Sequence, residues 1–320
     1  MRSSTRSECD PEISFKGVAM NKELIDKQYY SILEILNRNS TIFNSKEYTY
    51  RLNKLEKVYL KMLSKNSFID EFYSFAHEIR AIDFFSKFNE IHIANDSNNE
   101  AGADIVFAHK YNIECVTCTT GDQKNTKILK KSGYQVYNKI IDYNEKFRQM
   151  SLRFTSVVES KKIKLDNYIK NGVIQNNEPF IIFINLGPLA EGWISNKFGP
   201  EVTKILVGRG FRRIIIDSKT TKQIGSTSFS FIPAIKNNNN SDINNNIFAD
   251  KSYSRISSII FTSANLNENY NFNNTVNFIN PHAINKIRIS DFNRLPYWNV
   301  NNKSEFVPRI KGRKFNIEIW

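Results

Sequence analysis

Three acidic residues stand where carboxylates could act together on one substrate. Glu78 lies in a periodic apolar segment, and Asp104 and Glu114 lie in two short extended runs that follow it closely in the chain. Hard divalent cations such as Mg²⁺ prefer carboxylate oxygens. A bound cation can polarise a phosphoryl oxygen and lower the pKa of an attacking water. These residues therefore predict a Mg²⁺ or Mn²⁺ site suited to hydrolysing a phosphodiester, with Asp104, Glu114 and Glu78 as the ligands.

Glu78 is a candidate metal ligand because of its spacing along an expected helix. Phe75, Glu78, Ile82 and Phe85 follow one another at intervals of three, four and three residues, which places them on one seam. A carboxylate on that seam faces the core and must be neutralised by a proton, a basic partner or a metal. The alternative is a residue at the boundary of the core that points outward or pairs with Arg80 or His77.

Asp104 and Glu114 are expected in the two strands of a β-hairpin. Asp104 precedes the apolar run Ile105 to Phe107, and Glu114 alternates with apolar neighbours in the run Tyr111 to Thr117. One acid in each strand can bring both acids to one cation. Either acid taken alone could equally be a solvent-facing strand residue.

The combination of Glu78 in a helix, Asp104 in Ala101-Gly102-Ala103-Asp104-Ile105-Val106-Phe107 and Glu114 in Ile113-Glu114-Cys115-Val116-Thr117 resembles the PD-(D/E)XK nuclease superfamily, also called restriction-endonuclease-like. The resemblance covers roughly residues 69 to 217 and rests on a short motif of low specificity. It implies an α/β fold with an αβββαβ core, a mixed sheet flanked by helices, and Mg²⁺ held by the acids. The chain departs from the pattern at Val116, where the family has a lysine that orients the attacking water and stabilises the charged transition state.

Lys161 is the candidate to replace that lysine. Met150, Phe154, Val157, Lys161, Leu165 and Tyr168 repeat along one seam of an expected helix, so Lys161 should point inward toward the strand that carries Glu114. The family sometimes takes its lysine from another element. The alternative is that Lys161 lies at the edge of the stripe and reaches solvent. Lys110, at the hairpin turn, is a weaker candidate.

The elements around these residues follow from periodicity and turn signals. A helical N-terminal arm or subdomain is expected over residues 1–66, and a nuclease-like α/β domain over 67–320. The expected elements of the second part are helices over Ile69–Phe88 and Glu145–Lys170, with the second ending at Asn171-Gly172, and strands over Ile91–Ala94, Ala103–His109, Tyr111–Thr117, Phe180–Asn185, Arg213–Asp217 and Ile256–Thr262. The asparagine-rich tract Lys236–Asn246 reads as an exposed loop insertion, and the tail Lys303–Trp320, with alternating Phe315, Ile317 and Ile319, as an edge strand.

The charge balance indicates a polyanionic partner. Forty-five Lys and Arg against thirty-two Asp and Glu give a formal net charge of +13, a field that would attract nucleic acid, with double-stranded DNA favoured. An AT-rich coding bias toward Lys, Asn and Ile would produce the same excess. Arg153, Arg209, Arg212 and Arg213 are the expected phosphate contacts, because arginine suits bidentate phosphate binding. Weaker candidates for phosphate contact are the lysines of one run, Lys124, Lys127, Lys130 and Lys131. A homodimer is a possible assembly.

Cysteine usage and hydropathy limit the other classes. Three cysteines are too few for a disulfide framework, and Cys115 and Cys118, three residues apart in a strand, should point to opposite faces and so do not suit one zinc ion. No apolar run reaches the roughly 18 residues of a membrane span. We therefore expect a cytoplasmic Mg²⁺-dependent nuclease. The alternatives are a catalytically inactive relative that binds nucleic acid, and a protein-interaction module that uses the N-terminal helices or the asparagine tract.

Overall fold

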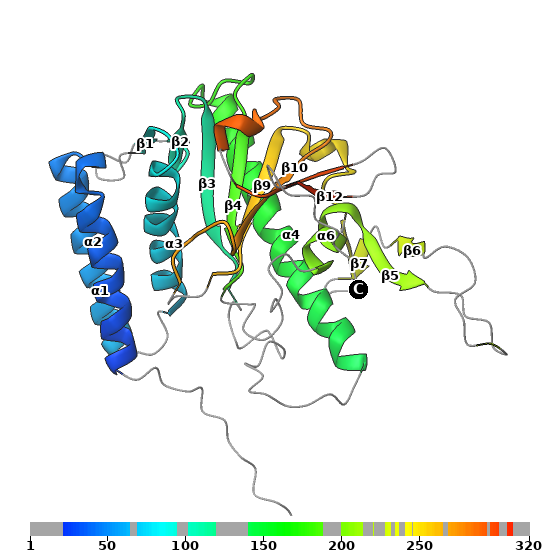
Figure 1. The fold of residues 1–320 in the computed structure, drawn as a ribbon, viewed down its shortest axis with the longest axis horizontal. Helices are drawn as coiled ribbons and strands as arrows, with labels where there is room; N and C mark the ends of the chain where they lie inside the picture. Colours follow the sequence, from blue (N-terminus) through cyan, green and yellow to red (C-terminus); the bar gives the residue numbers. More distant parts are fainter. Residues whose placement is uncertain are drawn as a thin grey trace, which may run out of the picture.

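The computed structural model describes residues 22–64, 69–94, 102–119, 140–187, 200–213, 220, 228–231, 234–236, 241–244, 246–264, 268–292, 295–300 and 306–309. Three helices come first, followed by an α/β arrangement of strands and helices (Figure 1). The helices are α1 (Lys22–Arg38), α2 (Ser45–Ser64), α3 (Ile69–Ser86), α4 (Ile140–Lys170) and α6 (Pro200–Val207). The strands are β1 (Ile91–Ile93), β2 (Ile105–Phe107), β3 (Tyr111–Thr117), β4 (Phe180–Asn185), β5 (Arg209–Arg213), β6 (Ser228–Phe231), β7 (Ala234–Lys236), β8 (Asp242–Asn244), β9 (Ile256–Thr262), β10 (Thr275–Ile279), β11 (Tyr297–Val300) and β12 (Phe306–Arg309).

A mixed sheet of eight strands organises the molecule, in the order β1-β2-β3-β4-β9-β10-β11-β12. Strand β2 is antiparallel to both β1 and β3, whereas β3, β4 and β9 run parallel to one another. Every residue of β4 is buried. A parallel central strand covered on both faces reads as a continuous apolar run, which is why Phe180–Asn185 could be recognised from sequence.

Helices cover both faces of this sheet, and each face has its own apolar core. Helices α1, α2 and α3 pack together on one face, in a cluster that includes Ile113 and Phe183. Helix α4 and α6 lie with the other cluster, which includes Ile182 and Ile184 from the alternate positions of β4. Side chains of adjacent strand residues point to opposite faces. Neighbouring residues of β3 therefore lie in two different cores, one beneath α1 to α3 and the other beneath α4 and α6.

The expected elements around the candidate site are confirmed. The helix predicted over Ile69–Phe88 is α3, the hairpin is β2 and β3, and Phe180–Asn185 and Ile256–Thr262 are β4 and β9. Helix α4 begins earlier than expected, at Ile140. It ends where predicted, because Gly172 adopts a φ of 71° and the backbone N–H of Val173 donates to the carbonyl of Tyr168 at 2.9 Å.

One expectation in the C-terminal half needs correction, and two others fall mostly outside the described residues. Of the strand predicted at Arg213–Asp217, only Arg213 is described, as the last residue of β5, and residues 214–217 lie outside the described part. The asparagine-rich tract is not simply a loop, because its two ends pair as the antiparallel strands β7 and β8, with Lys236 opposite Asp242. Backbone pairing there overrides the low strand propensity of asparagine. The edge strand is Phe306–Arg309, and Phe315, Ile317 and Ile319 lie outside the described residues.

Gly187, just beyond the end of β4, is predicted to be intolerant of any side chain. A Cβ atom built there would lie 2.1 Å from the backbone oxygen of Ala264, so the end of β4 or the chain beyond β9 would have to move. We expect Gly187→Ala to lower the free energy of unfolding by about 1–3 kcal/mol, the usual effect of overpacking. Urea denaturation measures this, with Gly102→Ala as the control because its Cβ would make an ordinary 3.7 Å contact with Ala94. Equal stability of the two variants would contradict the prediction.

Candidate functional site

A fully buried carboxylate lies at the centre of the candidate site. Glu114 is 0% exposed and extends from β3 on the face that α4 covers, together with Val116, while Cys115 packs on the opposite face. Its Oε2 atom accepts hydrogen bonds from Nζ of Lys161 at 2.7 Å and from Nζ of Lys164 at 2.9 Å. Its Oε1 atom accepts from the Tyr168 hydroxyl at 3.1 Å. All these partners come from α4, so one helix neutralises the buried acid.

Helix α4 supplies these groups because of their spacing. Lys161, Lys164 and Tyr168 are three and four residues apart, so they lie on one side of the helix. The prediction that Lys161 points inward toward Glu114 is confirmed, since its side chain is only 16% exposed. Lys164 and Tyr168 had not been recognised as polar partners. Their signal was available in the spacing: Tyr168 had been assigned to the seam as an apolar residue, and Lys164 adjoins it.

The charges around Glu114 change the protonation of the groups beside it. Burial, the largest single effect, lowers the pKa of Lys164, but the charge and hydrogen bond of Glu114, the Tyr168 hydroxyl and the charge of Asp104 together outweigh burial and raise that pKa above its ordinary value. Burial raises the pKa of Tyr168 to about 12. The single hydroxyl hydrogen of Tyr168 is shared between Glu114 and the backbone carbonyl of Gly102, which connects α4 to the chain just before β2. Lys164 is therefore charged and Tyr168 neutral at pH 7.

Asp104 lies next to this group, immediately before β2. Its carboxylate accepts the backbone N–H of Cys115 at 2.7 Å and so continues the ladder between β2 and β3 by one side-chain hydrogen bond. Burial, and then the charges of Glu114 and Glu78, raise the pKa of Asp104 to about 7, against the smaller opposing effect of Lys161 and Lys164. Burial, aided by the two neighbouring carboxylates, thus favours the protonated form of Asp104.

Glu78 approaches from α3 but is bound to a partner that the sequence analysis had not considered. Its Oε1 atom lies 2.6 Å from Nη1 of Arg51, a buried residue of α2 that also pairs with Glu47 at 2.6 Å. The alternative pairing of Glu78 with His77 or Arg80 is therefore replaced by one with Arg51. The i, i+4 spacing of Glu47 and Arg51 indicates their own pair, but it does not indicate the contact of Arg51 with Glu78 on another helix.

His77 belongs to the core instead. Its Nε2 faces the carbonyl of Phe183 at 2.9 Å and its Nδ1 faces the hydroxyl of Tyr270 at 2.6 Å. Burial lowers the pKa of His77 to about 4, so the imidazole is neutral at pH 7. Because a carbonyl can only accept, Nε2 carries the proton and the Tyr270 hydroxyl donates to Nδ1.

The three acids do not form one compact ligand set in the metal-free protein. Within the described residues, the one group of three potential metal-ligand atoms that all lie within 4.8 Å of one another is Glu90, His92 and His109. Those three side chains are each more than half exposed and hydrogen-bond to one another where the start of β1 meets His109 of the β2–β3 turn, an arrangement that needs no ion. In the candidate site, Asp104 and Glu114 are therefore close enough for their charges to interact. Glu78, paired with Arg51, contributes a weaker electrostatic effect on Asp104.

The predicted phosphate contacts fall into two groups. Arg153 lies on α4, eleven residues before Lys164 and on the same side, because eleven residues are close to three helical turns. Arg209, Arg212 and Arg213 belong to β5, which pairs with β6 in a separate small sheet, and their side chains lie outside the described part. Lys124, Lys127, Lys130 and Lys131 also lie outside it.

Lys110, the weaker candidate for the missing lysine, is bound to Asp291 at 2.5 Å. It therefore has a structural partner just before the start of β3, outside the group of side chains around Glu114. His282 follows Asn280 in a turn, where its backbone N–H donates to Oδ1 of Asn280. Cys115 and Cys118 pack in different cores on the two sides of the sheet, as their spacing predicted.

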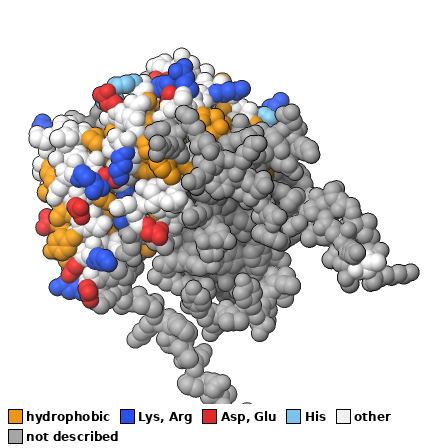
Figure 2. Space-filling model, in the orientation of Figure 1, with side chains coloured by type: hydrophobic (Ala, Val, Ile, Leu, Met, Phe, Trp, Pro, Cys, Tyr) orange, Lys and Arg blue, Asp and Glu red, His pale blue; other side chains and the backbone are white. Residues whose placement is uncertain are grey.

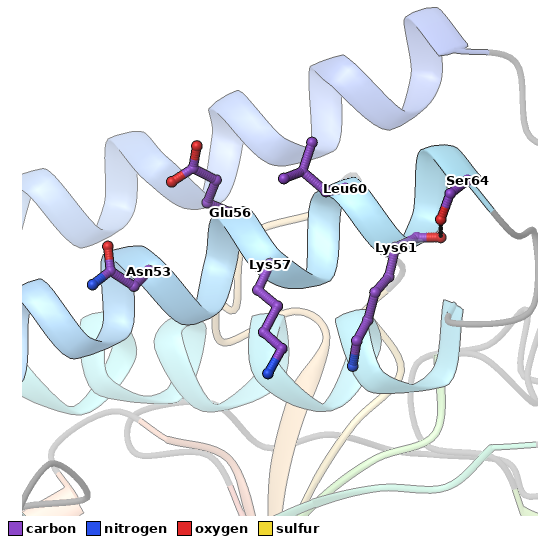
Figure 3. A pocket seen from close by; sticks show the side chains of 6 residues that line it. All are labelled: Asn53, Glu56, Lys57, Leu60, Lys61 and Ser64. Carbon is purple, nitrogen blue, oxygen red and sulfur yellow. Dashed lines mark hydrogen bonds between the residues drawn. The ribbon is translucent and has the colours of Figure 1, made fainter.

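The surface adds two observations. Figure 2 shows blue and red side chains interspersed over the described part of this face, so the positive charge is not gathered there into one patch. An open hollow on α2 is lined by six residues of that single helix, with Lys57 and Lys61 beside Glu56 and Leu60 (Figure 3). This hollow includes none of the residues of the Glu114 group and is separate from the candidate site. We use that name for the charged and polar side chains around Glu114, which are Arg51, Glu78, Asp104, Glu114, Lys161, Lys164 and Tyr168.

Comparison of the chain with protein-family models, with curated proteins and with solved structures finds no match. Among the described residues, no helix has both the length and the apolar character needed to cross a membrane.

Proposed function

We propose that this chain is a divalent-cation-dependent nuclease that hydrolyses phosphodiester bonds, with DNA as the favoured substrate. The observation that carries the proposal is the buried Glu114 carboxylate bound to Lys161, with Asp104 beside it. A lysine next to an acidic ligand is what the PD-(D/E)XK resemblance requires and what Val116 cannot supply from β3. Lys161 reaches the same neighbourhood from α4.

The order of elements supports a restriction-endonuclease-like core. Helix α3, strands β1, β2 and β3, helix α4 and strand β4 follow one another as helix, three strands, helix and strand. The acids of the resemblance occupy α3, the residue immediately before β2 and the middle of β3. We propose that these six elements are an αβββαβ nuclease core, to which the N-terminal helices and strands β9 to β12 are added.

Asp104 and Glu114 suit a hard cation. Both offer carboxylate oxygens, the ligands that Mg²⁺ and Mn²⁺ prefer. The raised pKa of Asp104 comes first from burial and then from the charges of Glu114 and Glu78, and a cation would offset both effects by stabilising the ionised carboxylate. A Mg²⁺ ion bound there would supply Lewis-acid activation of the scissile phosphate. Glu78, fixed by Arg51, would add negative charge from the α3 side.

The residues of α4 would hold and neutralise the substrate. Lys161 would place a compact positive charge beside the scissile phosphate, where negative charge develops during hydrolysis. Arg153 would contact a phosphate farther along the same helix face, and Arg209, Arg212 and Arg213 would extend the contact from β5. The net charge of +13 favours a polyanionic substrate.

The second candidate is a catalytically inactive relative that binds nucleic acid or a protein. The observation in its favour is that Oε2 of Glu114 already accepts two ammonium groups and Glu78 already has Arg51 as its partner. A site satisfied in this way is stable without a cation. Such a protein would bind DNA with the same affinity whether or not Mg²⁺ is present.

A cleavage assay on the wild-type chain tests the choice. We expect plasmid DNA to be nicked or linearised with Mg²⁺ or Mn²⁺, and EDTA to stop the reaction. Single-stranded DNA and RNA, assayed in parallel, define the substrate class. Binding without cleavage of any of these nucleic acids, with either metal, would exclude the nuclease and leave the inactive relative.

A further inference from the structure

We propose that Lys164 occupies in the metal-free protein the place on Glu114 that a cation takes, and that its ammonium then moves to a substrate phosphate. This inference rests on the proposed nuclease function and concerns the regulation of the same site. It divides the two lysines of α4 into one that stays, Lys161, and one that exchanges, Lys164.

The contacts of Glu114 show why an exchange is needed. Glu114 is 0% exposed, and its Oε2 atom already holds Lys161 at 2.7 Å and Lys164 at 2.9 Å. Its other oxygen accepts from the Tyr168 hydroxyl. A cation that binds Glu114 at the crowded Oε2 therefore has to displace one of the two ammonium groups.

The charge balance leads to the same conclusion. Glu114 and Asp104, when ionised, carry two negative charges, and Lys161 and Lys164 carry two positive ones. Adding a divalent cation while both lysines remain would leave two uncompensated positive charges around the buried Glu114 carboxylate, where like charges repel. Loss of Lys164 from the carboxylates removes one of them, and a phosphodiester of the substrate would balance the other.

Exposure identifies which lysine leaves. The Lys164 side chain is 40% exposed and that of Lys161 is 16% exposed, so the ammonium of Lys164 can be rehydrated at lower cost. Its Nζ atom lies 5.2 Å from the centre of the Tyr168 ring, at the outer edge of the group. Lys164 also shares its side of α4 with Arg153, so a released ammonium joins an existing positive stripe.

The exchange predicts that cation and substrate binding are coupled through Lys164. Without DNA, Lys164 competes with the cation and weakens its binding. With DNA, Lys164 contacts a phosphate and no longer competes. By linkage, each ligand should then increase the affinity for the other in the wild type, and this coupling should weaken when the charge of Lys164 is removed.

Titration calorimetry with Mn²⁺ alone tests the competition. We expect Lys164→Gln to bind Mn²⁺ about threefold to tenfold more tightly than the wild type, the size expected for loss of one partly exposed charge. Glutamine keeps a hydrogen-bond donor for Glu114, and thermal unfolding verifies that the variant is folded. The matched control is Lys162→Gln on the same helix, because Lys162 pairs with Glu159 instead.

Labelling of lysine amines in the wild type provides a second measurement that needs no variant. Acetylation followed by mass spectrometry should show Lys164 becoming several times more reactive when Mn²⁺ is added, while Lys161 stays protected. Binding of Mn²⁺ with equal affinity to the wild type and Lys164→Gln, and with unchanged labelling, would overturn the exchange and leave the nuclease proposal intact. Absence of Mn²⁺ binding in every variant would remove the cation site and this inference together.

Discussion

Replacing Lys161 by alanine is expected to reduce DNA cleavage by roughly 10²- to 10³-fold, the usual effect of losing one preorganised electrostatic donor. The reason is its position, since Nζ of Lys161 lies 2.7 Å from the buried Glu114 and can face the phosphate that the cation binds. DNA affinity should change little, because one contact among many phosphate contacts is lost. Single-turnover cleavage and equilibrium binding of the same substrate measure the two effects separately.

Two further variants make this test specific. Lys161→Arg should not restore cleavage, because the planar guanidinium fills a different volume from a compact ammonium. Lys162→Ala removes the same charge from the neighbouring position and should cleave normally, since Lys162 is directed toward Glu159 and Tyr253. Full cleavage by Lys161→Ala would refute the role of Lys161 and make Lys164 the next residue to test.

Asp104→Asn is expected to weaken Mn²⁺ binding by more than about 100-fold, because even residues that only support a metal ligand cost about 10- to 100-fold when replaced. Asparagine retains an oxygen that can accept the backbone N–H of Cys115, so the hairpin should be preserved. Calorimetric titration of Mn²⁺ measures the loss. Asp166→Asn is the control, since Asp166 pairs at the surface with Arg255. Equal affinity in wild type and Asp104→Asn would remove Asp104 from the site.

The same substitution should stabilise the metal-free protein at high pH. The folded-state pKa of Asp104, about 7, lies above its ordinary value of 3.8, so the folded protein holds the proton more tightly than the unfolded chain does. The stability from this proton is complete below pH 3.8 and is lost as the pH rises to about 7. At pH 8, Asp104→Asn should therefore be more stable than the wild type by on the order of 2 kcal/mol. The difference should vanish near pH 4, as urea denaturation at both pH values can show.

Sequence reasoning located the elements that carry the candidate site, because each has a clear local signal. The seam of α3, the alternation in β3 and the unbroken apolar run of β4 each depend on neighbouring residues alone. The inward direction of Lys161 could be predicted for the same reason, since a helix with five apolar residues on one seam fixes the direction of the sixth. Here the spacing and the packing agree.

The partners of the acids could not be predicted in the same way, because they depend on contacts between distant segments. Arg51 meets Glu78 only because α2 packs against α3, a relation that no local pattern specifies. Lys164 and Tyr168 adjoin the predicted seam, but their contact with Glu114 depends on the angle at which α4 crosses β3. The pairing of β7 with β8 likewise joins segments whose composition argued against strands.

The position of β4 between β3 and β9 also bears on the order in which the chain can assemble during synthesis. Every residue of the Glu114 group, from Arg51 to Tyr168, leaves the ribosome before β4, and β9 follows more than seventy residues after β4. Helices α1 to α3 and the hairpin can condense through contacts that are short in sequence, whereas the pairing of β4 with β9 must first close a long loop. Every residue of the charged centre has thus been synthesised while one edge of β4 is still unpaired, so β4 is exposed to wrong pairing and aggregation until β9 arrives.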